Sequence, residues 1–261
     1  MTARLRAYAL WQARDYLMDR GTPTALIGAL FGYMVGGPLV GAAHLQLAQM
    51  SAVQVARGGG MAAIRASVMA EVTLTFLSLL LGNLVFLGAL FAMNGIVAND
   101  RKQGYYRFLF SKPLSPDRYY GQAFLVHWIG FLVITTLLGL LYQALVAPVL
   151  SVPLFVAVAL MYLCYAGVAF ALSAAARWDW LSLVAVTVAA NWAWLRFGQA
   201  SSPLTALLYL FPPIHRTSEV YTAAAKGAAL PWPLLAWFAG YGVACFVIGL
   251  VVLRYRRMAI V

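Results

Sequence analysis

Long stretches without an ionised residue constrain this chain more than any other feature. No Asp, Glu, Lys or Arg occurs between Arg20 and Arg57, between Glu71 and Asp100, or between Lys226 and Arg254. Each stretch can cross the hydrocarbon core of a bilayer, which is about 30 Å thick and needs roughly 20 helical residues. With 64% apolar and 10% charged residues, the chain lacks the charge that covers a soluble domain. The sequence therefore predicts a protein embedded in a membrane.

The apolar runs are continuous, which favours a helical bundle over a barrel of alternating strands. The uncharged run between Arg118 and Arg177 is about twice as long as one span needs. Pro148, Ser151 and Pro153 divide it in the middle. We predict one all-α transmembrane domain over residues 1–261, with six spans. Their approximate ranges are 23–45, 72–98, 118–147, 152–176, 180–196 and 232–254.

Two further segments are predicted to lie at the membrane surface. Residues 1–21 form an interfacial helix that is retained in the protein, with Trp11 and Tyr16 near the headgroups. Residues 203–226 form an external hairpin, because its prolines leave only residues 204–211 for a helix. That short helix is re-entrant or interfacial and does not form a seventh span.

The basic residues set the orientation. Most of the 18 Lys and Arg residues fall in the N-terminal segment, the loop over residues 99–118 and the C-terminus. Because cytoplasmic loops carry an excess of Lys and Arg, we predict that both termini are cytoplasmic. This topology and contact with anionic lipid headgroups account for the net charge of +11. A nucleic-acid partner is not implied.

The sequence contains few candidate residues for a catalytic, metal or cofactor site. The chain has no phosphate-binding Gly-Lys loop, no metal-ligand spacing and no nucleophile elbow, so we predict no catalytic site, metal or cofactor in it. No ionisable residue lies at mid-span, where coupled carriers keep them, so energy for transport must come from outside the chain. The strongest polar groups in or near the spans either bond neighbouring helices or line a substrate pathway; they are Asn83, Asn94, Gln143 and Asn191.

Gly28, Gly32 and Gly36 form a stripe of small residues at four-residue spacing in the first predicted span. Such a stripe lets another helix approach closely. The partner helix belongs either to a second copy of the chain or to the same bundle, and the sequence leaves both possibilities open.

The loop over residues 99–118 combines charged and apolar side chains between two spans. Asp100, Arg101 and Arg107 alternate with Tyr105, Phe108 and Leu109, and Pro113 ends the short helix that these residues predict. One interpretation is an anchor of basic and aromatic residues at the membrane surface. The other is a helix whose apolar side chains enter the groove of a partner protein.

This loop resembles the first cytoplasmic loop of ABC type-2 permeases, the membrane subunits of many bacterial exporters. Asp100 stands in the place of the family's acidic residue, Gly104 in that of its Gly, and residues 108–110 in that of its Leu-rich turn. The Pro-centred segment 111–115 and Gly121 complete the match. Tyr in place of Thr at position 105, Asp in place of Glu at 100 and Gln in place of Lys at 122 depart from the pattern.

The resemblance implies a coupling helix that docks on a separately encoded ABC ATPase. Two ATPases, which bind ATP and Mg, would join two permease copies, expected to form a homodimer, in the cytoplasmic (inner) membrane of a bacterium. The direction implied is export, while the Tyr, Trp, Phe and small residues of the spans themselves suggest an amphipathic or lipid-like cargo. The ATPase-contacting residues implied are Asp100, Arg101, Gly104, Tyr105, Arg107, Phe108, Leu109 and Pro113.

Two alternatives to a transport subunit remain open from the sequence. A membrane assembly or structural subunit without its own pathway would lack a neighbouring ATPase gene. A lipid-acting membrane enzyme would gather Asn or His residues around one cavity.

Overall fold

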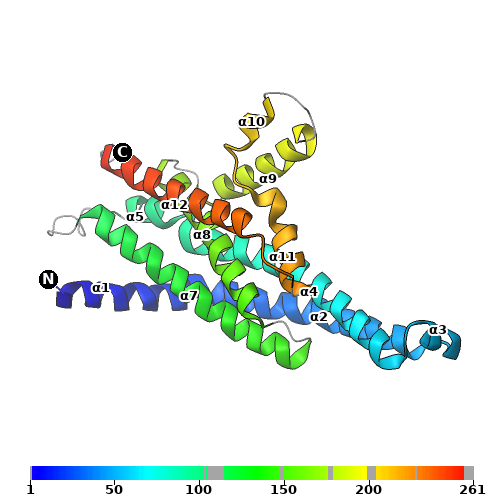
Figure 1. The fold of residues 1–261 in the computed structure, drawn as a ribbon. Coiled ribbons are helices and arrows are strands. Elements are labelled where there is room, and N and C mark those ends of the chain that lie inside the picture. The colour runs from blue at the N-terminus through cyan, green and yellow to red at the C-terminus, as the bar shows by residue number, and fades with distance from the viewer. Residues whose placement is uncertain are drawn as a thin grey trace.

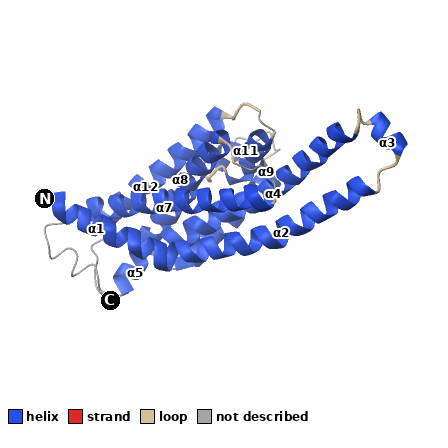
Figure 2. Ribbon diagram, turned by 90° about the horizontal axis from the view of Figure 1, so that it is seen from below, coloured by secondary structure: helices blue, strands red, loops and turns tan. Residues whose placement is uncertain are grey.

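A computed structural model describes residues 2–102, 104, 115–146, 150–175, 179–198, 204–226 and 228–255. Within these ranges the chain forms helices joined by turns, without a strand. Five long helices dominate the fold (Figures 1 and 2). They are α2 (Thr22–Ala48), α4 (Met61–Met93), α7 (Pro116–Leu145), α8 (Val152–Ala175) and α12 (Trp232–Tyr255).

These five helices, two of them with short neighbouring segments, are long and apolar enough to cross a membrane. The predicted all-helical architecture is therefore confirmed over the described residues, with five helices that could cross a membrane. α9 (Asp179–Phe197) covers the predicted span 180–196 but is not one of the five. The count of six spans stays a prediction.

The N-terminal segment differs from the prediction of a separate interfacial helix. α1 (Thr2–Asp15) continues through the π-helical turn η1 (Tyr16–Gly21) directly into α2. Pro23 has no backbone N–H, and the wider turn before it accommodates this missing donor without breaking the helix. The Tyr16 side chain is buried within the bundle, with only 1% exposed, and its position near the headgroups stays a prediction.

The segment over residues 46–70, between the first two predicted spans, is mostly helical. α3 (Ala52–Arg57) connects α2 to α4, and α4 begins eleven residues before the predicted span 72–98. The outer ends of α2 and α4 extend with α3 beyond the other helices (Figures 1 and 2). Ala43, Ile64, Val68 and Val72 form a small apolar core between them. The hairpin therefore projects as a packed unit.

α8 is the central helix of the bundle, and most of its side chains are buried. α12 lies against it at very short range. A Cβ atom added to Gly167 of α8 would overlap the carbonyl oxygen of Gly242, and one added to Gly242 would overlap the carbonyl oxygen of Leu163. Glycine at these two positions permits backbone-to-backbone packing, as at close helix crossings in membranes.

Four shorter elements complete the described fold: α5 (Ile96–Lys102), α10 (Leu204–Leu208), η2 (Ile214–Arg216) and α11 (Thr217–Ala225). The last three lie within the predicted hairpin 203–226. α11 is not a surface helix, because Val220 and Tyr221 are buried in the main apolar core. The hairpin thus closes one end of the bundle with an inserted helix.

The packing of α8 against α12 yields a stability prediction with a matched control. Gly242→Ala forces a methyl group against the Leu163 carbonyl, whereas Gly240→Ala, in the same helix, places its methyl in open space. We expect Gly242→Ala to lower the free energy of unfolding by about 1–3 kcal/mol. Gly240→Ala should be neutral or stabilising by up to about 1 kcal/mol. Thermal unfolding in detergent measures both, and equal effects would contradict the close approach.

Candidate functional site

The candidate site lies where α5 and α7 meet, at the end of the bundle that also carries α1 and the end of α12 (Figure 1). α4 ends at Met93, and the chain turns at Asn94 and Gly95 before α5 begins. The first backbone N–H groups of a helix have no partner within the helix. Here the hydroxyl oxygen of Ser173, on α8, accepts from the N–H of Val97 at 3.1 Å and from that of Ala98 at 3.4 Å. A side chain of the central helix therefore caps α5.

The other end of α5 is fixed to α7. The Tyr120 hydroxyl donates a hydrogen bond to Oδ2 of Asp100 at 3.0 Å, and the Asp100 side chain is buried. The Tyr120 ring also packs against Phe170 of α8, with 5.8 Å between ring centroids. We call Ser173, Asp100 and Tyr120 the α5 clamp. It fixes the point where the chain leaves α5 relative to the point where α7 begins.

Two further features shape this end of the bundle. Gly104 has a φ of +68°, in the left-handed region that favours glycine, as is usual just beyond the end of a helix. At the start of α7, Nε of Arg254 donates to Oδ2 of Asp117 at 3.0 Å. This exposed ion pair ties the end of α12 to the same place, but contributes little energy because water screens it.

The structure places only part of the predicted coupling segment. Asp100 belongs to the α5 clamp and Gly104 follows α5. Arg101 lies in α5, within the described backbone. Tyr105, Arg107, Phe108, Leu109 and Pro113 lie outside the described residues. What the structure contributes is the geometry of the two helices from which this segment emerges.

The four amide side chains do not gather at one site. Asn83 Nδ2 donates to the Leu79 carbonyl and Asn191 Nδ2 to the Thr187 carbonyl, each within its own helix. Asn94 alone is seen to bridge helices, because its Oδ1 accepts from the Ser182 hydroxyl of α9 at 3.3 Å. Gln143 is exposed near the far end of α7. Their use as one substrate-binding set is therefore not supported by position.

Gly28, Gly32 and Gly36 pack within the chain. All three are buried, and a Cβ atom at Gly32 would overlap the ring of Tyr142 on α7. The Tyr142 hydroxyl donates to the carbonyl oxygen of Gly28. Of the two possibilities left open by the sequence, the structure shows the one inside the bundle, so this stripe is not available to a second copy.

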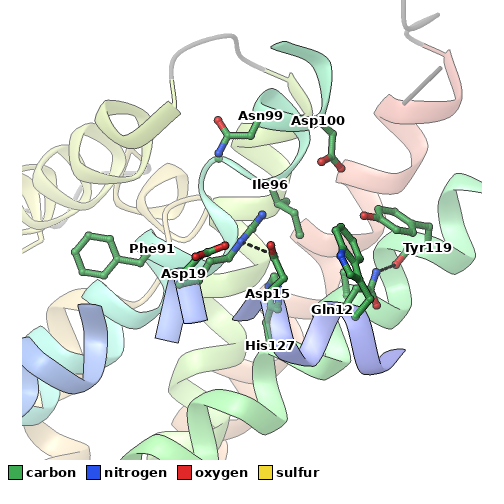
Figure 3. A pocket seen from close by; sticks show the side chains of 13 residues that line it. Gln12, Asp15, Asp19, Phe91, Ile96, Asn99, Asp100, Tyr119 and His127 are labelled. Atoms are coloured by element: carbon green, nitrogen blue, oxygen red, sulfur yellow. Dashed lines mark hydrogen bonds and ion pairs between the residues drawn. The ribbon is translucent and has the colours of Figure 1, made fainter. Parts of the chain in front are cut away.

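A polar cavity at the same end was missed by sequence reasoning. It has a volume of about 450 Å³ and lies between α1, η1, α5 and α7 (Figure 3). Gln12, Asp15, Asp19 and Arg20 reach it from the N-terminal helix, and Asp100 reaches it from α5. One signal was present in the sequence: three of only seven acidic residues line this cavity in a chain of net charge +11.

Aromatic packing anchors the opposite end. The imidazole of His215, in η2, stacks on Trp194 of α9 with 3.9 Å between ring centroids. Burial lowers the pKa of His215, which favours the neutral ring. Arg216 makes a two-pronged ion pair with Glu219, which holds the pKa of Glu219 below its usual value. The Tyr241 hydroxyl of α12 donates to the Leu210 carbonyl at 2.6 Å. These contacts fix the hairpin to α9 and α12.

Comparisons with protein-family models, with curated proteins and with solved structures find no match to this chain.

The α5 clamp gives a direct test. Tyr120→Phe removes one hydroxyl and leaves the buried Asp100 carboxyl short of a hydrogen bond. We expect a loss of about 1–3 kcal/mol in the free energy of unfolding. Tyr33→Phe is the matched control, because the Tyr33 side chain is 78% exposed. Unfolding by heat or denaturant in detergent compares the two variants. An unchanged free energy of unfolding in Tyr120→Phe would mean that the bond to Asp100 does not stabilise the fold.

Proposed function

We propose that this chain is the membrane-spanning permease subunit of an ATP-binding-cassette exporter, coupled to a separate ATPase through residues 99–118. The observation that carries the proposal is the α5 clamp. A loop can transmit force from a partner only if both of its ends are fixed to the bundle. Asp100 and Tyr120 fix α5 to α7, and Ser173 fixes α5 to the central helix.

Contacts between helix ends support six passes. The end of α12 meets the start of α7 through Arg254 and Asp117, and the end of α8 meets α5 through Ser173. The first half of α12 contacts the hairpin at the opposite end, through Tyr241. In this proposal α9 carries the chain from one end to the other. Its 19 residues extend about 28 Å, close to the thickness of the hydrocarbon core.

The proposal requires a partner chain that supplies the energy for transport. The sequence has no nucleotide-binding Gly-Lys loop, and among the described residues no group of His, Cys, Asp and Glu is placed to hold a metal ion. A transport subunit of this kind depends on ATP and Mg bound to another chain. Apolar side chains at positions 105, 108 and 109, on a loop otherwise rich in charge, suit insertion into a groove of that chain.

The proposed assembly contains two copies of this chain and two ATPases in the cytoplasmic membrane of a bacterium. Both termini and the loop over residues 99–118 face the cytoplasm, as the basic residues predict. Because Gly28, Gly32 and Gly36 are used inside the bundle, contact between copies needs another surface. The cargo is amphipathic or lipid-like, and the direction is export.

The coupling assignment predicts the effect of single substitutions in the loop. Phe108→Ala should reduce both co-purification with the cognate ABC ATPase and its stimulated ATP hydrolysis, by about tenfold, as for a buried aromatic anchor at an interface. Arg107→Ala should act in the same direction. Arg65→Ala, in the projecting hairpin at the other end of α4, is the control and should leave both unchanged. Normal assembly of the Phe108→Ala variant would refute the coupling role.

A further inference from the structure

The cavity at the N-terminal end of the bundle has an unusual balance of charge. Its lining includes three carboxylates, from Asp15, Asp19 and Asp100, against the single guanidinium of Arg20. Arg20 is already engaged, because its Nε lies 3.2 Å from Oδ2 of Asp15 and its Nη1 donates to the Ala92 carbonyl at 2.9 Å. Asp19 and Asp100 thus leave an excess of negative charge in a chain that is otherwise strongly basic. The cavity favours a cation.

A second observation points to a ligand that donates hydrogen bonds. The Gln12 side chain lines the cavity and is only 3% exposed. Its Nε2 donates to the Tyr119 carbonyl at 3.4 Å, but its Oε1 has no partner among the described residues. A buried polar atom without a partner is costly. Together with the carboxylates, this oxygen offers acceptors to a group that brings several N–H donors.

The cavity has a polar floor and a mixed mouth. Gln12, Asp100 and His127 are buried at its floor. Its exposed rim combines the rings of Trp11 and Phe91, which are 49% and 37% exposed, with the polar side chains of Asp19 and Asn99. Figure 3 shows side chains from the N-terminal helix and from α5 bordering the same space.

The same stretch of helix carries apolar side chains that face away from the protein. Leu10, Leu17 and Met18 are 73%, 50% and 68% exposed. A helix with such residues beside charged ones lies at the level of lipid headgroups, where aromatic rings also collect. This pattern favours a position of the cavity mouth near the boundary between headgroups and acyl chains.

We propose that this cavity binds the primary ammonium headgroup of a membrane phospholipid, of the phosphatidylethanolamine class. The ammonium, with three N–H donors, enters among the carboxylates of Asp19 and Asp100 and the Gln12 oxygen. The phosphate remains at the exposed rim of the cavity, and the acyl chains lie along the exposed apolar residues. A free cation would gain nothing from the apolar rim, whereas a phospholipid uses both parts of the cavity.

Binding should be tested on the purified chain alone, so that the result is independent of the proposed ATPase partner. Native mass spectrometry of the delipidated protein in detergent gives a Kd for each of four lipids with identical acyl chains: phosphatidylethanolamine, its N-methyl and N,N-dimethyl forms, and phosphatidylcholine. Each methyl group removes one N–H donor. We expect affinity to fall along the series, by about tenfold in total, because charge-assisted hydrogen bonds are lost. Equal affinity for all four lipids would overturn the proposal.

Matched variants locate the site. Asp19→Asn removes one charge from the exposed rim, and Asp100→Asn removes one from the floor but retains an oxygen that can accept from Tyr120. Both should bring the ratio of the two end-member affinities close to one. Glu71→Gln, an exposed acidic residue outside the cavity, should retain the full ratio. If Asp100→Asn fails to fold, Asp19→Asn decides, and a retained preference in that variant would contradict the site.

Two further arms separate other occupants. Soluble glycerophosphoethanolamine should compete with the lipid only at a much higher concentration, because it lacks the acyl chains; competition at equal concentration would overturn the lipid assignment. Asp19→Asn should leave assembly with the ATPase intact. If it weakens that assembly while the chain shows no lipid preference, the cavity takes a basic side chain of a protein, and the lipid proposal fails.

Discussion

The arrangement of the bundle depends on the short distance between α8 and α12. Gly167 and Gly242 bring the two backbones together, and this contact buries α8 in the centre of the bundle. From that position α8 presents Phe170 to α7 and Ser173 to α5. In a membrane, where neighbouring lipid is as apolar as the helices, close packing and hydrogen bonds hold helices together. The α5 clamp is thus an extension of the α8–α12 contact.

Several of the few ionised side chains lie at the ends of helices. Asp117 and Arg254 join two helix ends, and Arg216 and Glu219 stabilise the hairpin at the other end. The remaining concentration of acidic side chains, around Asp100, lies beside the loop that we propose to contact the ATPase. A lipid held in that cavity would contact both the N-terminal helix and α5, so lipid composition and coupling could influence each other.

The long helices could be predicted from the sequence because absence of charge over about 20 residues has one main physical explanation. Their ends could not. α4 begins at Met61 and not near residue 72. Apolar packing against α2 extends α4 beyond the uncharged stretch, on the N-terminal side of Glu71. The continuity of α1 into α2 depends on the π-helical turn before Pro23, for which hydrophobic periodicity gives no signal.

The candidate site was predictable only in part. The loop pattern singles out Asp100 and Gly104, but not Tyr120, which bonds Asp100, or Ser173, which caps α5, because contacts between distant helices are set by packing. The orientation of Gly32 toward α7 depended on the same unknown. The cavity could have been suspected from the acidic residues, yet its formation requires α1 and α5 to lie together, which no local pattern encodes.

The central claim is that the loop between α5 and α7 is the element by which a partner ATPase acts on this bundle. Site-specific photo-crosslinking in cells tests it most directly, with a photoreactive amino acid placed at position 108 in the loop or at position 65 in the projecting hairpin. The account predicts a cross-link from position 108 to an ABC ATPase and none from position 65. A cross-link from position 65 alone, or none from position 108 in a folded and membrane-inserted protein, would contradict it.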